Sequence, residues 1–250
     1  MFAIVRKRLF DSLPSADRID EVAQAYVDAL QKAKRVDTIA TTPETFIERI
    51  RETYPFHPSI RDIVARFAEN RGYQKTRALI RLLRLAVRGA FNANDNAFLI
   101  GLQHLDFNDQ GTLEEIRKIN PAYANAISRD VADRGNALAE KIAAADGVPT
   151  ASSVAKVLLM SSLSTAESPL RGLTDGELIE TLVDPLLEVS EIKAALGRIQ
   201  GQAWYLFQGV DLRVFFGQTA NVTAEITEIA SNIAEEQVDQ TMRGKLQQAV

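Results

Sequence analysis

Four arginines at helical spacing are the residues of this chain best placed to do chemistry. Arg77, Arg81, Arg84 and Arg88 lie four, three and four residues apart, and no acidic residue occurs between Arg71 and Arg88. In an α-helix this spacing puts all four within an arc of roughly 60° on one face. Like charges one turn apart repel each other. An anion, from a neighbouring element or from a ligand, is therefore expected to face this arginine ridge.

Arg77 is the member of the ridge that points most directly to phosphate chemistry. It lies close to the predicted N-terminus of its helix, where free N–H groups and the helix dipole favour an anion. A guanidinium can contact a phosphate through two hydrogen bonds and keeps its charge. From spacing alone, however, a solvated or ion-paired arginine is the favoured interpretation of Arg77. Arg81, Arg84 and Arg88 are predicted to pair with acids on neighbouring helices or on another domain, with a phosphate or DNA-backbone contact as the alternative.

The chain offers little else for catalysis or metal binding. It has no cysteine and only two histidines, His57 and His104, so a thiol nucleophile and a multi-histidine metal site are excluded. His57, between Phe56 and Pro58, is predicted to satisfy backbone groups at the start of a helix. Nothing near His104 and Asp106 completes a catalytic set, and no metal site is expected.

The composition is that of a soluble, cytoplasmic globular protein. Of the 250 residues, 46% are hydrophobic and 25% are charged, which is ordinary for one or two globular domains. No apolar run approaches the roughly 20 residues that span a bilayer, so no membrane partner is expected. Residues 1–100 carry 17 basic and 12 acidic side chains, whereas residues 101–250 carry 12 and 21. This acidic second part argues against general nucleic-acid binding there.

The first hundred residues are predicted to be helical throughout. Apolar residues repeat at the helical period in the first of these segments. Thr42 can cap the second, and Pro43 fits its first position. The expected helices cover about residues 17–35, 43–54, 58–70 and 75–91.

The middle of the chain is predicted to be less regular. Residues 98–107 are apolar and partly alternating, as in a short strand. Thr112 and Glu115 have the spacing of a capping box before a short helix. A longer helix is predicted from Pro121 to about Gly147.

After a boundary at about residue 150, the order of elements is that of a winged-helix domain. Helices are predicted over residues 151–163, after a capping box at Thr174 and Glu177, and after a cap at Ser190. Two aromatic runs with hairpin spacing follow, over residues 203–207 and 212–216. Trp204, Tyr205 and Phe207 are predicted to fill the core of this domain. A last helix is predicted over residues 222–248.

Five segments, in this order, resemble the middle of a family of large bacterial P-loop ATPases of unknown function, often encoded in anti-phage and restriction-type operons. The segments are residues 4–10, 54–58, 74–83, 105–109 and 204–206. The most specific of them are Tyr-Pro-Phe-His-Pro at 54–58 and Gln-Lys-Thr-Arg at 74–77. The resemblance covers most of residues 1–216.

The resemblance implies a mostly α fold and a role in nucleotide sensing. Residues 1–97 look like the helical lid of AAA+ ATPases, residues 98–149 are a connecting segment, and residues 150–250 are a winged-helix-like domain with a β-hairpin and a C-terminal helix. In such lids an arginine near the start of the last helix, called sensor 2, contacts the nucleotide phosphates. The matching position is Arg77, and Arg81 is the next candidate for ATP binding.

The chain departs from that family in lacking the parts that hydrolyse ATP. It has no Gly-x-x-x-x-Gly-Lys-Ser/Thr motif and no apolar strand ending in paired acids for Mg²⁺. ATP is therefore expected only with an upstream P-loop core, which would be the main partner. The expected function is a non-catalytic nucleotide-sensing and coupling region, with protein partners on the winged helix.

The alternative is a stand-alone winged-helix protein that binds DNA or acts as a scaffold. Its recognition helix would be residues 190–200, which offer only Lys193 and Arg198 beside Glu188 and Glu191. Duplex binding draws on several basic contacts. Nucleic acid is therefore a disfavoured partner for this domain.

Overall fold

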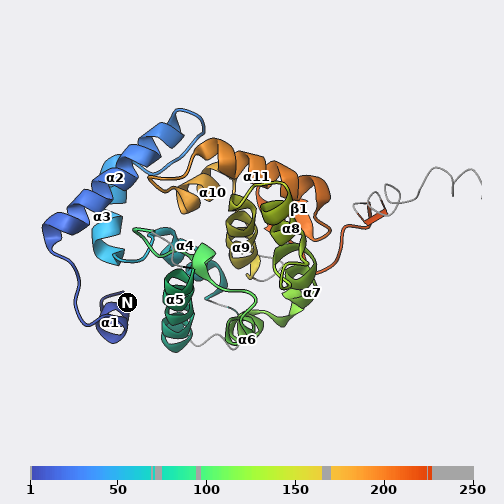
Figure 1. The fold of residues 1–250 in the computed structure, drawn as a ribbon, viewed down its shortest axis with the longest axis horizontal. Helices are drawn as coiled ribbons and strands as arrows, with labels where there is room; N and C mark the ends of the chain where they lie inside the picture. The colour runs from blue at the N-terminus through green and yellow to red at the C-terminus, as the bar shows by residue number, and fades with distance from the viewer. Residues whose placement is uncertain are drawn as a thin grey trace, which may run out of the picture.

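The computed structural model describes residues 2–68, 70, 75–93, 97–164, 170–223 and 225–226. These residues form a mostly helical protein with a two-stranded antiparallel sheet near the end of the described chain (Figure 1). The predicted fold class is confirmed. Within the described residues, no helix combines the length and the apolar character that crossing a bilayer requires.

Five helices make up the first part of the chain, and the predicted ones are confirmed to within a few residues. They are α1 (Phe2–Leu9), α2 (Ala16–Lys34), α3 (Pro43–Thr53), α4 (Ser59–Phe67) and α5 (Lys75–Asn92). The hydroxyls of Ser15 and Thr42 cap α2 and α3 by accepting hydrogen bonds from backbone amides three residues on. Local capping chemistry thus sets where these helices begin.

The strand predicted over residues 98–107 is wrong. Its backbone makes one parallel bridge, between Phe56 and Ile100, and then turns into the 3-10 helix η1 (Leu102–His104). The amide of His57 donates to the carbonyl of Ile100 at 2.9 Å. Leu102 lies in this 3-10 helix, and Leu105 and Phe107 follow it; all three side chains are buried. Their alternation therefore does not come from a β-strand.

The capping box predicted at Thr112 and Glu115 is also wrong. Helix α6 (Gln110–Ile119) begins earlier, and Asp109 caps it by accepting a hydrogen bond from the amide of Thr112 at 2.8 Å. A carboxylate is a strong acceptor at the positive end of a helix. Thr112 consequently lies inside α6, and Glu115 faces α5.

The helix predicted from Pro121 to about Gly147 is broken. It consists of η2 (Pro121–Tyr123), α7 (Ala124–Ala126), the π-helical turn η3 (Ile127–Val131) and α8 (Leu138–Ala145). Asp130, fully buried in the π-helical turn, accepts a hydrogen bond from the amide of Tyr205 at 2.7 Å. Gly135 then adopts a φ of +91°, which a helix cannot continue. A tertiary contact therefore overrides the helical period.

The last described region has the predicted order of three helices and a hairpin. The elements are α9 (Thr150–Ser162), α10 (Asp175–Leu182), α11 (Val189–Gln202), β1 (Leu206–Gln208) and β2 (Val214–Phe216). The capping box of Thr174 and Glu177 is confirmed, since each side chain accepts from the backbone amide of the other. Ser190 is not a cap, because α11 begins at Val189. The helix predicted over residues 222–248 lies almost wholly outside the described residues.

The aromatic residues of the hairpin do not fill the core as predicted. Trp204, Tyr205 and Phe207 are half-buried. Leu206 and Phe216, which face each other in the antiparallel register, are the buried ones. Successive strand side chains point to opposite faces, so an unbroken aromatic run cannot lie on one face.

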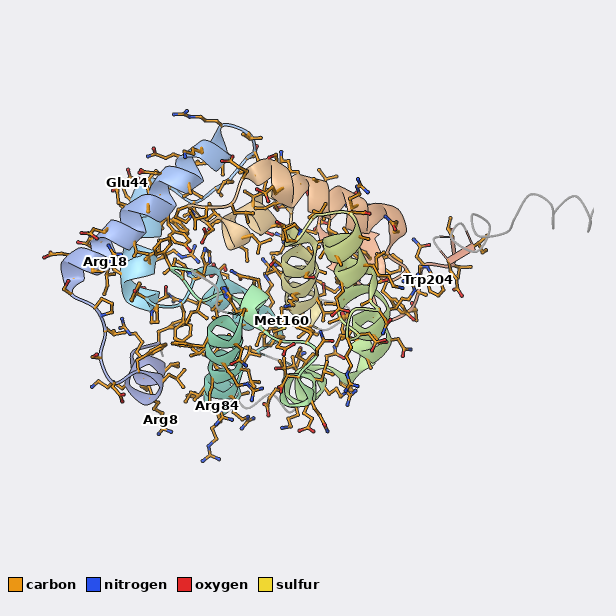
Figure 2. All side chains as sticks on the ribbon, viewed as in Figure 1. Arg8, Arg18, Glu44, Arg84, Met160 and Trp204 are labelled. Atoms are coloured by element: carbon orange, nitrogen blue, oxygen red, sulfur yellow. The ribbon has the colours of Figure 1, made fainter. Side chains whose placement is uncertain are left out.

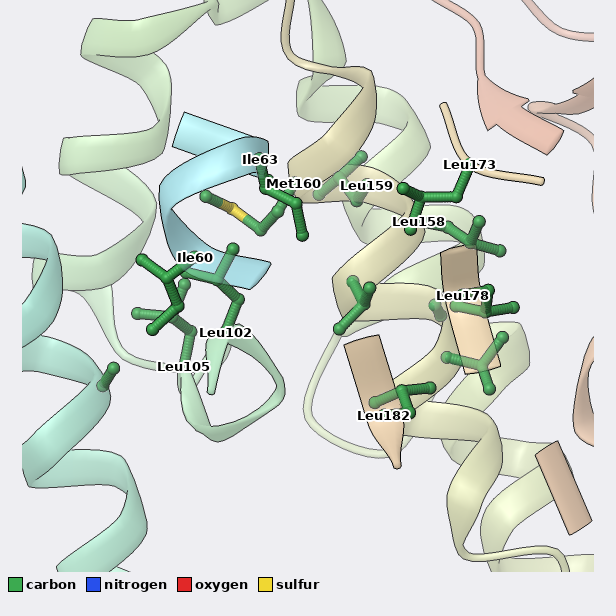
Figure 3. Close-up of a cluster of buried hydrophobic side chains, with 14 of the residues drawn as sticks. Ile60, Ile63, Leu102, Leu105, Leu158, Leu159, Met160, Leu173, Leu178 and Leu182 are labelled. Atoms are coloured by element: carbon green, nitrogen blue, oxygen red, sulfur yellow. The ribbon is translucent and has the colours of Figure 1, made fainter. Parts of the chain in front are cut away.

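One cluster of buried side chains runs through all three predicted segments, with α9 at its centre. Helix α9 contacts α4, α8, α10, α11, η1 and β2. Figure 3 shows Ile60 and Ile63 of α4 beside Met160 of α9, with Leu158 of α9 close to Leu178 of α10. The lid-like and winged-helix-like regions are therefore packed against each other.

Two glycines allow close approach between elements. A Cβ at Gly89 in α5 would overlap the backbone carbonyl of His104 in η1, and a Cβ at Gly176 in α10 would overlap that of Thr38. Only a residue without a side chain fits at such contacts. The first contact fixes the C-terminal part of α5 to η1, and the second fixes α10 to the segment after α2.

Candidate functional site

Helix α5 is divided into an apolar face and an arginine face, as the sequence predicts. Leu79, Leu82, Leu83 and Ala86 are at most 2% exposed and join the core. The arginine ridge lies on the other side, toward α6 and the solvent. The two faces have different roles, because the first holds the helix in place and the second remains available for anions.

Arg81 has an anionic partner on α6. Its Nε lies 2.8 Å from a carboxylate oxygen of Glu115, whose other oxygen lies 2.6 Å from Nζ of Lys118. Burial alone raises the pKa of the Glu115 carboxyl, but hydrogen bonds from Lys118 and Arg81 outweigh it and hold that pKa below its usual value. Arg81 is thus paired with an acid of the same chain, and its predicted contact with a nucleotide stays a prediction.

Arg88 also pairs with α6. A guanidinium nitrogen of Arg88 lies 2.5 Å from a carboxylate oxygen of Asp109, the residue that caps α6. The predicted pairing of ridge arginines with acids on a neighbouring helix is therefore confirmed for Arg81 and Arg88. It is not found for Arg84 among the described residues.

Arg77 and Arg84 are the exposed members of the ridge that lack an anionic partner within the described part of the chain. Arg77 lies in the first turn of α5, which contains no acid. A cation there is disfavoured by the helix dipole. Figure 2 shows Arg84 extending from the lower edge of the molecule into solvent, on the edge where Arg8 of α1 also lies. These two guanidinium groups are free to meet an external anion.

The two histidines are structural. His57 is 2% exposed and its Nδ1 lies 2.8 Å from the hydroxyl of Ser59 at the start of α4. The rings of Tyr26 and Phe46 lie against it, with centroids 6.1 and 5.9 Å away. Burial lowers the pKa of His57 to about 3, so the imidazole is neutral. His104 accepts a hydrogen bond from the amide of Gly101 within η1.

A charged cluster that sequence reasoning missed joins the two halves of the molecule. Arg66 of α4 donates to the backbone carbonyls of Leu170 and Gly172 and lies 3.6 Å from Glu177. Arg213, beside β2, donates to the same Glu177 at 2.6 Å. Arg66, Glu177 and Arg213 are each more than 30 positions apart in the chain, and the other two partners of Arg66 are backbone carbonyls. No spacing in the sequence could therefore reveal this cluster.

Most of the chain matches one known protein family. A family model described as DUF499 second domain matches residues 1–193. The chain belongs to this DUF499 second-domain family. A search of curated proteins found no match, and a search of solved structures found none either. The part matched as DUF499 second domain runs from α1 into α11 and contains the whole arginine ridge.

The basic residues of the would-be recognition helix, α11, are already paired. Nζ of Lys193 lies 2.7 Å from Asp37, and Arg198 lies 2.8 Å from Asp146. Both contacts direct α11 toward other parts of the same chain. They leave α11 without a free cationic face of its own.

The described residues of the DUF499 second domain contain no group of three or more His, Asp or Glu side chains that could hold a metal ion. The arginine ridge is therefore the candidate functional site. Within the described residues, Arg77 and Arg84 of this ridge have no acidic partner, whereas Arg81 and Arg88 are paired with Glu115 and Asp109.

Proposed function

We propose that this DUF499 second domain is the non-catalytic nucleotide-sensing and coupling region of a P-loop ATPase that acts in anti-phage defence. ATP would be bound by a core outside this chain, and Arg77 would contact its phosphates as sensor 2. The resemblance of residues 54–58 and 74–83 to AAA+-like ATPases motivates the proposal. A family description that counts this region as a second domain supports a partner domain in the same protein.

The observation that carries the proposal is the state of Arg77. It is exposed in the first turn of α5 and has no acid within reach among the described residues, whereas Arg81 and Arg88 are neutralised by α6. A guanidinium in this position adds to the positive end of the helix. Phosphate is an anion that can bind both the guanidinium group of Arg77 and the free N–H groups at the start of α5.

The cluster around Arg66 supports the coupling part of the proposal. Arg66 lies on α4, the helix before α5, and binds the carbonyls just before α10. Through Glu177 it reaches Arg213 at the hairpin. A displacement of α4 and α5 by a nucleotide would thus reach the winged-helix-like region through charged contacts.

A stand-alone DNA-binding winged helix is the competing function. The ion pairs of Lys193 and Arg198 weigh against it, because DNA would have to displace Asp37 and Asp146. We therefore assign α11 and the hairpin to protein contacts.

Steady-state ATP turnover of the ATPase that contains this region tests the proposal. Arg77→Ala should lower kcat by at least about 10-fold, because arginines on a transferring phosphoryl group contribute factors of about 10³ or more. Its thermal unfolding should change little, since Arg77 is exposed. The 250-residue chain alone should show no turnover.

Arg117→Ala is the matched control, because Arg117 is an exposed arginine on the adjacent α6 without an ion pair among the described residues. Its kcat should equal that of the wild type. The sensor assignment is wrong if Arg77→Ala and Arg117→Ala have the same turnover, or if Arg77→Ala unfolds the domain.

A further inference from the structure

The arginine ridge continues into a wider basic surface along α1 and α5. The two helices contain eight basic residues, three in α1 and five in α5, and no acid. They contact each other, and α1 is held to the core by Val5 and by ring contacts of Phe2 and Phe10 with Phe56. The apolar side of α1 is therefore used for packing. Its outer side presents Lys7, which is exposed.

Arg8 and Arg84 extend the cationic surface on the same edge of the molecule (Figure 2). Both are exposed, and neither has an ion pair within the described residues. Arg88, beside them, is half-exposed and shared with Asp109. The surface thus offers Lys7, Arg8 and Arg84 as free cations.

Phe91 is the unusual member of this surface. It lies seven residues, or about two helical turns and 10 Å, beyond Arg84 and hence on the same face of α5. Its side chain is 75% exposed. An exposed phenylalanine contributes nothing to the core. Next to a row of cations, it has the form of a platform on which a nucleic-acid base stacks.

We propose that Lys7, Arg8, Arg84 and Phe91 form a binding site for single-stranded nucleic acid. The three cations contact backbone phosphates, and the ring of Phe91 stacks on an unpaired base. A free aromatic face requires an unstacked base, which favours a single strand over a duplex. This site uses neither Arg77 nor α11 and does not depend on the proposed nucleotide sensor.

An acidic protein segment or an anionic membrane would meet the same cations. Neither requires a single aromatic ring in line with the arginines at two-turn spacing. The contribution of Phe91, measured apart from that of the charges, therefore separates nucleic acid from the other two partners.

Fluorescence anisotropy of a fluorescein-labelled 20-nucleotide oligothymidine with the intact chain tests the proposal. Raising monovalent salt from about 50 to about 200 mM should weaken binding about 20-fold, from a slope of about −0.7 per phosphate contact and three contacts. Arg84→Ala should reduce this slope by about 0.7. Phe91→Ala should weaken binding about 5-fold or more and leave the slope unchanged.

Arg35→Ala is the control, since Arg35 is an exposed arginine at the C-terminal end of α2. Figure 1 shows α2 running away from α1 toward the other edge of the molecule. It removes the same charge and should bind as the wild type does. The proposal is overturned by absence of oligothymidine binding at 50 mM salt, by tighter binding of a duplex, or by wild-type affinity of Phe91→Ala. Binding of polyglutamate or phosphatidylserine vesicles that oligothymidine cannot compete away would also overturn it. Phe91→Ala should leave ATP turnover unchanged, because Phe91 is not part of the proposed nucleotide sensor, so this result and the turnover result can fail separately.

Discussion

Among single residues, the paired arginines of α5 and the imidazole of His57 differ in whether an acidic side chain lies beside them. Arg81 and Arg88 have counter-charges, because Glu115 of α6 and its cap Asp109 place carboxylate oxygens 2.8 and 2.5 Å from them. His57 has no counter-charge and loses its proton instead, since burial lowers its pKa to about 3. Its Nε2 has no hydrogen-bond partner within the described residues. Among these residues, the cations are therefore the side chains that have an acid beside them, and the buried imidazole without one is neutral.

His57 should make stability depend on pH. The folded pKa of about 3 is below the ordinary value of 6.5, so the neutral form folds preferentially. Its contribution is fully present above pH 6.5 and is lost as the pH falls from 6.5 toward 3. Between pH 7 and pH 5 the loss should be about 2 kcal/mol. Urea unfolding at the two pH values, for the wild type and His57→Gln, measures it.

The variant serves as the control for all other titrating groups, which the two proteins share. The free energy of unfolding of His57→Gln should fall by about 2 kcal/mol less than that of the wild type over this interval. Equal pH dependence in both proteins would mean that folding does not lower the pKa of His57.

At the scale of elements, the ends of helices decide much of the structure. Thr174 caps α10 and shares a reciprocal pair of hydrogen bonds with Glu177. Ser190 also carries a hydroxyl group but lies inside the first turn of α11. The two positions therefore provide a direct comparison of a real cap with an apparent one.

Thr174→Ala should lower the free energy of unfolding by about 1 kcal/mol, the usual cost of losing an N-cap. Ser190→Ala should change it by less than about 0.5 kcal/mol, because Ser190 is exposed and caps nothing. Thermal denaturation followed by circular dichroism compares them. A larger loss in Ser190→Ala would show that Ser190, and not the position before Val189, begins α11.

Helices whose caps and periods are local could be predicted from the sequence, and those set by distant contacts could not. The starts of α2, α3 and α10 follow from Ser15, Thr42 and Thr174. The break around Asp130 could not be foreseen, because it depends on the amide of Tyr205, 75 residues away. The same limit holds for the site. Spacing predicted the arginine face, but only the placement of α6 separates paired Arg81 from exposed Arg84.

At the scale of the whole molecule, contacts between the first and last regions hold the fold together. Tyr26 donates to Asp184 at 2.7 Å, and Thr41 donates to Glu180 at 2.7 Å. Gly176 of α10 packs directly on the segment after α2. These contacts join residues more than 130 positions apart. The stability of each region therefore depends on its packing against the other.

Gly176→Ala tests that packing. A methyl group at Gly176 would overlap the backbone carbonyl of Thr38, so the two regions must move apart. Overpacking of this kind should lower the free energy of unfolding by about 2 kcal/mol. Gly197→Ala in α11 is the control, because no atom lies within 4 Å of its new Cβ. It should raise stability by about 0.5–1 kcal/mol. Equal effects in urea denaturation would contradict the close contact of α10 with Thr38.

The contact of Gly89 with η1 holds the C-terminal part of α5, so any change in the angle of the helix there would displace its N-terminal end most. At Gly89 the backbone of α5 packs directly on the backbone carbonyl of His104. Arg77 is twelve residues away, or about 18 Å along the helix. A tilt of α5 by about 5° about Gly89 would therefore displace Arg77 by about 1.6 Å. Such a displacement is enough to make or break a hydrogen bond to a phosphate, while the backbone at the pivot hardly moves.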